Sequence, residues 1–197
     1  MHPIEPGVGG QGVVLASDII GETAVLAGYD VKKTDTLGMA QRGGAVVSHV
    51  RIAEKVWSPI IRDGSVDLIL AFEKLEAARW AHYLKPGGIV IVNDYIQPPL
   101  SVGLGAEAYP TQEEIEAILK ARTSHVYFID ANALATEKTG NVRTANILML
   151  GCMSVFAPLD RETWERSIRE RMPARLVDIN LAAFEAGRKE LEGVRIQ

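Results

Sequence analysis

A glycine-rich stretch near the N-terminus holds the first residues whose type and spacing could do chemistry. Residues 7–12 read Gly-Val-Gly-Gly-Gln-Gly, which fits the pattern G-x-G-x-x-G, and an apolar helix is expected directly after them. Glycines permit positive φ angles and let backbone N–H groups approach an anion, while the start of a helix offers unpaired amides and a positive dipole end. The stretch therefore predicts a bound phosphate-bearing ligand. A tight turn that serves only helix packing is the alternative.

A dinucleotide such as NAD or FAD is the narrower interpretation of the same pattern, and two features weaken it. A dinucleotide loop should follow a strong apolar strand, but Pro3 and Pro6 flank the residues before it, so we expect the first strand to be short, marginal or absent. An acidic residue that holds a ribose should end the second strand. Asp30 lies at the start of that strand and Asp35 just past its end, so the match is loose.

Four other residues could be reactive, and a structural role is favoured for most of them. His49 lies in a β-branched run, and no motif places a nucleophile or second acid beside it, so we expect a core or interface histidine bonded to backbone rather than a general base. Arg51 shares its face and is equally suited to an intersubunit ion pair. Cys152 lies in an apolar run and predicts a small buried hydrophobe. Glu73 is expected to start a helix, with a pocket-lining role as the alternative.

The elements that must position these residues alternate between strand and helix. Strands are expected at 29–33, 45–52, 67–71, 88–92 and 125–130, and helices at 11–28, 74–83 and 111–122. Helices at 144–156, 160–171 and 174–191 dominate the C-terminal third. This alternation predicts an α/β fold, a Rossmann-like three-layer α/β/α sandwich with a largely parallel sheet, formed as one domain over residues 1–197.

Composition limits the classes of function. A chain of 197 residues that is 47% hydrophobic can bury one substantial core, and a net charge of −4 without a run of like charges argues against nucleic-acid binding. A single cysteine can form neither an internal disulfide nor a four-thiolate metal site. The N-terminal residues lack the pattern of a secretory signal, and the longest uncharged stretch, 144–159, is too short to span a bilayer. We therefore expect a cytoplasmic protein with no membrane contact.

A second glycine loop distinguishes between families. Residues 36–52, TLGMAQRGGAVVSHVRI, taken together with residues 7–31, resemble the gamma-type subunit of the 2-oxoacid:ferredoxin oxidoreductases. The G-M-A-Q-R-G-G version is most similar to the beta (small) subunit of indolepyruvate:ferredoxin oxidoreductase. The likeness continues through LKPGGIVIVN and NVRTANILMLG, so it covers most of residues 7–151.

The resemblance implies an enzyme subunit without clusters or catalytic residues of its own. In that family a 2-oxoacid such as indolepyruvate or pyruvate is decarboxylated on thiamine diphosphate, electrons pass through [4Fe–4S] clusters to ferredoxin, and the acyl group leaves on coenzyme A. Thiamine diphosphate and the clusters would belong to a large partner subunit, through which ferredoxin would be reached. This chain would contribute to the coenzyme A site and to the subunit interface, and a homodimer of the isolated chain stays open.

The resemblance also implies which residues contact coenzyme A. They belong to the first glycine loop, the loop before the second β-branched strand, and an asparagine on a later helix: Gly7, Gly9, Gly10, Gln11, Gly12, Gln41, Arg42, Gly43, Gly44 and Asn146. Backbone amides suit phosphates, and Arg42 could grip one bidentately. Asn146 lies among apolar residues and needs partners, so both a capping and a ligand role are open. A free-standing Rossmann-like nucleotide-binding or regulatory module is the alternative function.

Overall fold

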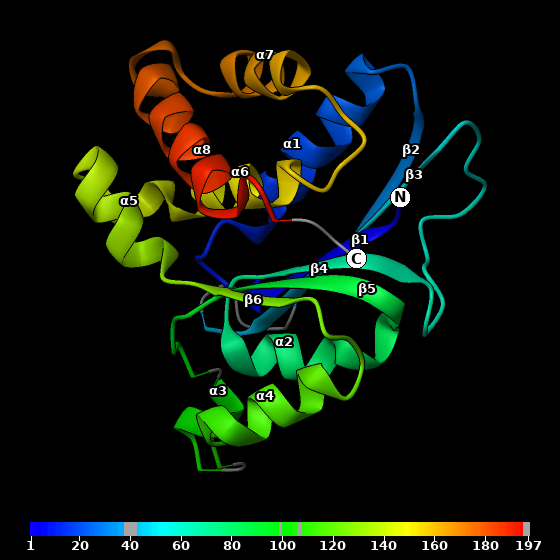
Figure 1. Ribbon diagram of the computed structural model, residues 1–197, viewed down its shortest axis with the longest axis vertical. Coiled ribbons are helices and arrows are strands. Elements are labelled where there is room, and N and C mark those ends of the chain that lie inside the picture. The colour runs from blue at the N-terminus through cyan, green and yellow to red at the C-terminus, as the bar shows by residue number, and fades with distance from the viewer. Residues whose placement is uncertain (38–42, 99, 106–107, 195–197) are drawn as a thin grey trace.

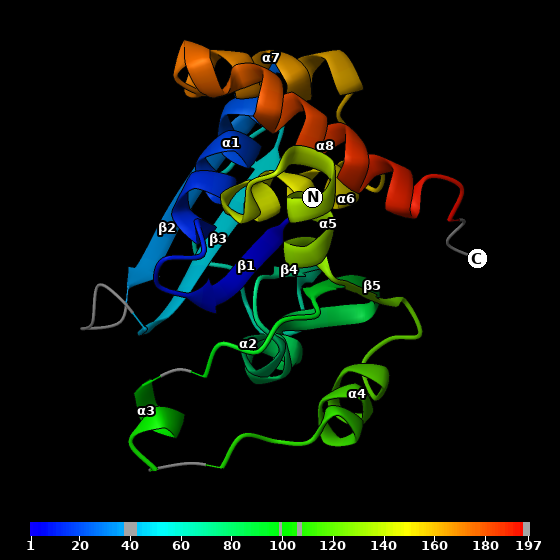
Figure 2. The same ribbon diagram turned by 90° about the vertical axis from the view of Figure 1, so that its left-hand side faces the viewer.

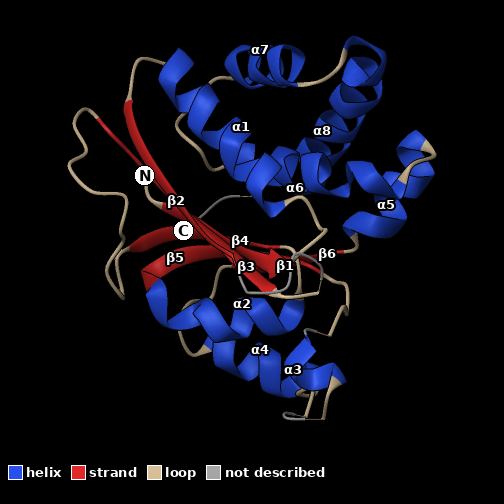
Figure 3. Cartoon of the chain, turned by 180° about the vertical axis from the view of Figure 1, so that it is seen from behind, coloured by secondary structure: helices blue, strands red, loops and turns tan. Residues whose placement is uncertain are grey.

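A six-stranded sheet forms the middle layer of the molecule (Figures 1 and 3). The computed structural model describes residues 1–37, 43–98, 100–105 and 108–194. The strands lie in the order β2-β3-β1-β4-β5-β6. Their bounds are β1 Pro3–Val8, β2 Asp30–Leu37, β3 Ala45–Ala53, β4 Val66–Ala71, β5 Leu84–Asn93 and β6 Val126–Ile129.

Helices cover both faces of this sheet (Figure 1). One face carries α1 Val13–Leu26, α5 Ala131–Thr139, α6 Ala145–Ser154, α7 Arg161–Arg171 and α8 Val177–Leu191. The other face carries α2 Lys74–Trp80 and α4 Gln112–Lys120, with the short α3 Leu100–Gly103 beyond them (Figure 2). Short 3-10 turns are η1 Ala81–Tyr83, η2 Val142–Thr144 and η3 Ala174–Leu176. The predicted three-layer α/β sandwich and its helical C-terminal third are confirmed.

Strand directions bring the ends of several strands to one edge. Adjacent strands run parallel in the pairs β1–β4, β4–β5 and β5–β6, whereas β3 runs antiparallel to both of its neighbours, β1 and β2. The sheet is therefore largely parallel, as the sequence predicts. The carboxyl ends of the parallel strands share one edge, which is where α/β sheets of this kind bind ligands.

The first strand is the clearest departure from the sequence-based expectation, which was wrong. β1 is six residues long, wholly buried, and hydrogen-bonded on both sides in the middle of the sheet. Proline removes only a donor, so the Pro6 carbonyl still accepts from the Phe72 N–H at 2.9 Å. The regular ladder with β4 covers just Pro3 and Ile4. The two prolines shorten the parallel pairing without preventing the strand.

Two helices on the same face of the sheet touch through their backbones. A Cβ on Gly187 of α8 would lie 1.8 Å from the Leu148 carbonyl oxygen of α6, and a Cβ on Gly151 would lie 2.0 Å from the Phe184 carbonyl oxygen. Only glycine allows so close an approach, and moving backbone atoms costs more than moving the end of a side chain. The α6–α8 contact is therefore fixed by this pair of glycines.

Gly187→Ala should lower the free energy of unfolding by about 1–3 kcal/mol, the usual range for overpacked cores, because the new methyl group forces α6 and α8 apart. Urea unfolding of the full chain measures this effect. Gly21→Ala is the matched control, since its Cβ would meet Val31 at an ordinary 3.6 Å. Because Gly21 lies within a helix, its replacement by alanine should raise the free energy of unfolding by about 0.5–1 kcal/mol. Equal effects at the two positions would contradict the backbone contact.

A carboxylic acid lies buried in the central strand. Glu5 has no exposed surface, and neither of its carboxyl oxygens has a hydrogen-bond partner in the described part of the chain. Its strand neighbour is Ser48, whose hydroxyl instead donates to Asp35 at 2.6 Å. Burial raises the pKa of Glu5 well above its usual value, with Lys33 opposing the shift and Asp35 adding to it. Burial therefore favours the neutral form of the Glu5 carboxyl group.

Because its pKa is raised in the folded state, Glu5 should make the protein less stable as pH rises above 4.5, the usual pKa of glutamate. The loss approaches about 1.4 kcal/mol per pH unit until the folded-state pKa is reached. Glu5→Gln removes this dependence, so its stability relative to the wild type should grow between pH 4.5 and pH 8. Urea titrations at several pH values measure the difference. A difference that stays constant with pH would refute the assignment.

Candidate functional site

The two glycine loops singled out in the sequence meet in the structure. The Gly9 N–H donates to the Gly44 carbonyl at 2.8 Å, and the Gly43 N–H donates to the Gly9 carbonyl at 3.3 Å. Gly43 has a φ of 78°, a conformation that favours glycine. Gln41 and Arg42, the other predicted residues of the second loop, lie outside the described residues.

The first loop is closed by its own glutamine. The side-chain oxygen of Gln11 accepts from the Val8 N–H at 2.8 Å, while the Gln11 N–H donates to the Val8 carbonyl at 3.1 Å. Gly10 and Gly12 have φ angles of 107° and 81°. A Cβ on Gly7 would lie 2.7 Å from a methyl of Val13, so Gly7 serves close packing under the helix. Gln11 keeps only its amide nitrogen for a ligand.

Helix α1 begins without a side-chain cap. Its N-cap residue is Gly12, and the first internal bond runs from the Ala16 N–H to the Gly12 carbonyl at 2.9 Å. The amides of residues 13–15 precede that bond, and no described side chain caps them. Uncapped amides at a helix start, together with the helix dipole, attract anions.

Asn146 comes to this helix start from α6. A Cβ on Gly12 would lie 2.5 Å from the amide nitrogen of Asn146, so the two residues are in close contact. The Asn146 side-chain oxygen accepts from the Ile147 N–H at 2.9 Å, and only 6% of the residue is exposed. Its oxygen therefore caps its own helix, while its nitrogen stays at the glycine loop. The capping role and the ligand role, both left open by the sequence, are compatible with this geometry.

A cavity of about 590 Å³ opens beside these groups, at the carboxyl edge of the sheet. We call it the glycine-loop pocket. It is lined by Gly10, Gln11, Gly12, Leu15, Phe72, Asn93, Tyr95, Gln97, Asn132, Val142, Arg143, Ala145 and Asn146. Gly9 lines a neighbouring hollow of about 330 Å³ instead. Gly7, Gly43 and Gly44 line neither cavity.

Sequence reasoning missed several residues of the glycine-loop pocket. Asn93 ends β5, donates to the side-chain oxygen of Asn132 at 3.2 Å and accepts from the Ala131 N–H at 3.1 Å. A polar residue that ends an apolar strand was the available signal. Arg143 brings a guanidinium group to the lining, and no acidic side chain is among the described lining residues. The pocket therefore favours an anionic ligand.

The acidic residues weighed for a dinucleotide lie elsewhere. Strand β2 is separated from β1 by β3, so an acid at its end is not beside the first glycine loop. Asp35 accepts from the Ser48 hydroxyl and pairs with Lys33 at 3.1 Å, and Asp30 pairs with Lys32 at 3.2 Å. Neither carboxylate lines the glycine-loop pocket. Since neither acid is placed to hold a ribose at the glycine loop, the structure does not support the NAD or FAD interpretation.

Two other candidate residues have structural roles. His49 packs between Trp80 and Tyr83, with ring centroids 5.8 and 5.5 Å away, and burial lowers the pKa of its imidazole. Its Nδ1 has no hydrogen-bond partner among the described residues, so the expected backbone bond is not found there. Cys152 is buried, and burial raises the pKa of its thiol to about 12, which confirms the prediction of an unreactive core cysteine.

Glu73 starts helix α2, as favoured from the sequence, and also accepts hydrogen bonds from a distant segment. One carboxylate oxygen accepts from the Glu76 N–H at 3.1 Å; the other accepts from the Gln97 N–H at 3.3 Å and the Tyr109 hydroxyl at 2.5 Å. Burial and the adjacent carboxylate raise the pKa of Tyr109, so its hydroxyl remains a donor. Glu73 therefore anchors both ends of residues 97–109, and with them the pocket wall at Tyr95 and Gln97.

In the described ranges no three His, Cys, Asp or Glu side chains gather as a metal site would need. None of the described helices combines the length and the apolar character required to cross a bilayer.

Fold and pocket together define a class of protein. It is an α/β protein whose glycine loop, uncapped helix start and single lining cation surround a pocket suited to an anion within the described residues, at the carboxyl edge of a mostly parallel sheet.

Comparisons with known proteins agree and are more specific. Residues 5–190 match the family model described as pyruvate ferredoxin/flavodoxin oxidoreductase. The chain is 39% identical to the indolepyruvate oxidoreductase subunit IorB of Thermococcus kodakarensis over 186 residues, 93% of this chain and 92% of that protein. The chain belongs to the pyruvate ferredoxin/flavodoxin oxidoreductase family.

Solved structures share the fold. The gamma subunit of a keto/oxoacid ferredoxin oxidoreductase from Geobacter sulfurreducens superposes with a TM-score of 0.72 at 24% identity, over 98% of this chain and 99% of that one. A 2-oxoglutarate:ferredoxin oxidoreductase from Magnetococcus marinus, with 2-oxoglutarate, coenzyme A and succinyl-CoA bound, gives 0.74 at 17% identity. The match covers all of this chain but 32% of that one.

Glu73→Gln should loosen residues 97–109, because a glutamine offers one carbonyl oxygen where the carboxylate serves three donors from two oxygens. The unsatisfied donors should lower the free energy of unfolding by about 1–3 kcal/mol. Limited proteolysis with mass spectrometry should place the first new cut within this segment. The exposed control Glu113→Gln should leave the cleavage pattern unchanged. Unaltered cleavage in Glu73→Gln would show that the segment is held by other contacts.

Proposed function

We propose that this chain is the small, non-cluster subunit of an indolepyruvate-type 2-oxoacid:ferredoxin oxidoreductase, and that its glycine-loop pocket holds phosphate groups of coenzyme A. The observation that carries the proposal is the uncapped start of α1, which faces a cavity lined by Arg143 and Asn146 and by no described acidic side chain. The indolepyruvate type rests on the similarity to the Thermococcus subunit.

The donors of the glycine-loop pocket suit coenzyme A, which carries several phosphates. Backbone amides at the start of α1 would donate to one phosphate, and the Asn146 amide nitrogen lies beside them. Arg143 would hold a phosphate through two parallel N–H bonds. A volume of about 590 Å³ is typical of a ligand pocket and would hold only part of so long a molecule. The thiol end would therefore extend out of this chain.

The chemistry of the complete reaction needs groups that this chain does not supply. Decarboxylation chemistry would be supplied by thiamine diphosphate, and electron transfer to ferredoxin by iron–sulfur clusters. Cys152 is the one cysteine in the sequence and is buried, so clusters would belong to a large partner subunit. The Magnetococcus chain is about three times as long as the part this chain matches, which supports such a partner. In this division the present chain binds and orients coenzyme A toward the acyl group on the partner.

A free-standing nucleotide-binding or regulatory module is the second candidate, since the same pocket would fit the phosphates of a nucleotide. Family membership over residues 5–190 favours the enzyme subunit. The two candidates differ in one property, because only the subunit requires a large partner for activity.

Arg143→Met should raise the apparent KM for coenzyme A roughly tenfold to a hundredfold with little change in kcat, because a charge-assisted bond worth about 1.5–3 kcal/mol is lost. The assay is 2-oxoacid- and coenzyme-A-dependent viologen reduction by the chain co-expressed with its large subunit. Arg175→Met, an exposed arginine on η3, is the control and should behave as wild type.

Two outcomes separate the parts of this proposal. An unchanged KM in Arg143→Met refutes the assigned phosphate contact but leaves the subunit role intact. Full activity of the large subunit without this chain refutes the subunit role.

A further inference from the structure

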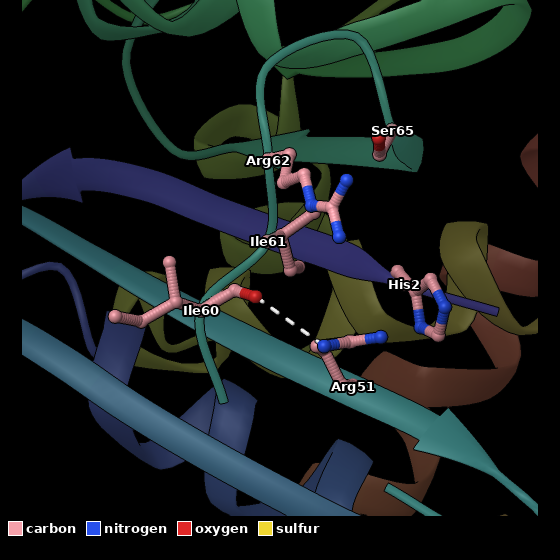
Figure 4. Close-up of a pocket in the computed structure, with 6 residues that line it drawn as sticks. All are labelled: His2, Arg51, Ile60, Ile61, Arg62 and Ser65. Carbon is pink, nitrogen blue, oxygen red and sulfur yellow. Dashed lines mark hydrogen bonds between the residues drawn. The ribbon is translucent and has the colours of Figure 1, made fainter. Parts of the chain in front are cut away.

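A second cavity lies at the opposite edge of the sheet from the glycine-loop pocket. It has a volume of about 290 Å³ and is lined by His2, Arg51, Ile60, Ile61, Arg62 and Ser65 (Figure 4). His2 directly precedes β1 and Ser65 directly precedes β4, so the cavity lies where these parallel strands begin. Arg51 comes near the end of β3, which runs the other way. We call this cavity the basic pocket.

Arg51 is held in the wall of the basic pocket, and no described acidic side chain pairs with it. Its Nη1 donates to the carbonyl oxygens of Ser58 at 3.1 Å and Ile60 at 3.4 Å. Its Nε is buried and has no hydrogen-bond partner in the part of the chain that the structure describes. Carbonyl groups position a guanidinium but do not neutralise it. A partly buried charge of this kind is costly unless a ligand or ion pairs with it.

Two other polar groups of the basic pocket, like the Nε of Arg51, lack partners among the described residues. Arg62 makes no side-chain hydrogen bond or ion pair with any described residue, and the Nδ1 of His2 is buried without a partner among them. Figure 4 shows the Arg62 guanidinium directed into the space that also faces Arg51 and His2. Several donors therefore converge on one cavity from β3, the segment before β1 and the segment before β4.

The charge of the basic pocket is positive. Burial, followed by nearby positive charges that include Arg51, lowers the pKa of His2, so its imidazole is neutral near pH 7 and the two guanidinium groups supply the charge. Asp67 is the neighbouring acid, but its Oδ2 accepts from the His2 backbone N–H at 2.6 Å and its Oδ1 pairs with Lys85. It does not line the cavity. Two positive charges facing one space match a doubly charged anion.

We propose that the basic pocket binds a tetrahedral oxyanion, a free phosphate or the phosphate of a small phosphomonoester. Arg51 and Arg62 would each donate to phosphate oxygens, and the Ser65 hydroxyl and His2 Nδ1 would complete the shell. About 290 Å³ is several times the roughly 30 Å³ of a water molecule, so there is room for the group that carries the phosphate. The site is separate from the glycine-loop pocket and does not depend on the function proposed above.

The test is calorimetric titration of the full chain with inorganic phosphate and with sulfate, at an ionic strength held constant with sodium chloride. Arg62→Met should weaken phosphate binding at least tenfold, and because Arg62 is exposed this variant should fold normally. Arg62→Lys, which keeps the charge, should recover part of the affinity. The control Arg122→Met removes another exposed arginine and should bind phosphate as the wild type does.

Three results would overturn the proposal. The first is an absence of phosphate binding above the chloride background. The second is binding that survives Arg62→Met but is lost in Arg143→Met, which would assign the phosphate to the glycine-loop pocket. The third is binding by the isolated chain that disappears in the complex with the large subunit, which would assign the basic pocket to an acidic group of that partner rather than to a free ligand.

Discussion

The central position of β1 is the constraint on which the rest of the structure depends. This strand pairs antiparallel with β3 on one side and parallel with β4 on the other. In the antiparallel register Val8 lies opposite Ala45, so the chain that leaves β1 must pass the chain that enters β3. The bonds between Gly9 and the 43–44 segment follow directly from that register. On the parallel side, the same loop faces the ends of β4 and β5, and the cavity forms between them.

The pairing of two distant glycine motifs is thus a consequence of strand order. A dinucleotide fold would place β2 beside β1, and an acid at the end of β2 would reach the bound ribose. Here β3 occupies that position, and the acids of β2 are used in ion pairs with lysines. The glycine loop keeps the uncapped helix start that suits a phosphate, while the ribose-binding half of the pattern is lost.

Local sequence patterns predicted most helices and strands, because the formation of such an element depends largely on residues that are close together in the sequence. The strands expected at 67–71 and 88–92 correspond to β4 and β5, and the helix expected at 111–122 corresponds to α4. The first strand is expected from its two prolines to be short, marginal or absent, yet it forms over six residues, because the loss of an N–H matters only where the ladder needs it. The burial of Glu5 could not be predicted from nearby residues, since its neighbours across the sheet come from other strands.

The candidate site was predictable only in part, for a similar reason. The glycine loop and Asn146 were indicated by motif and resemblance, and the structure brings them together. Asn93 and Arg143 join the cavity only once β5 and η2 are folded against it, and no local spacing encodes that proximity. The net charge of the chain did not predict the charge of either cavity. The chain is acidic overall, yet the described residues that line both cavities are basic or neutral.

The position of Asn146 depends on a contact at the far side of its helix. Asn146 lies in the first turn of α6, and Gly151 lies further along the same helix, pressed against the backbone of α8. A helix in backbone contact cannot slide or rotate without a clash, so its first turn is held in place as well. This explains how an amide group can be kept in close contact with Gly12, where a small shift of α6 would either close the cavity or open a gap. Packing at Gly151 and Gly187 and the Gly12–Asn146 contact are therefore linked through one rigid helix.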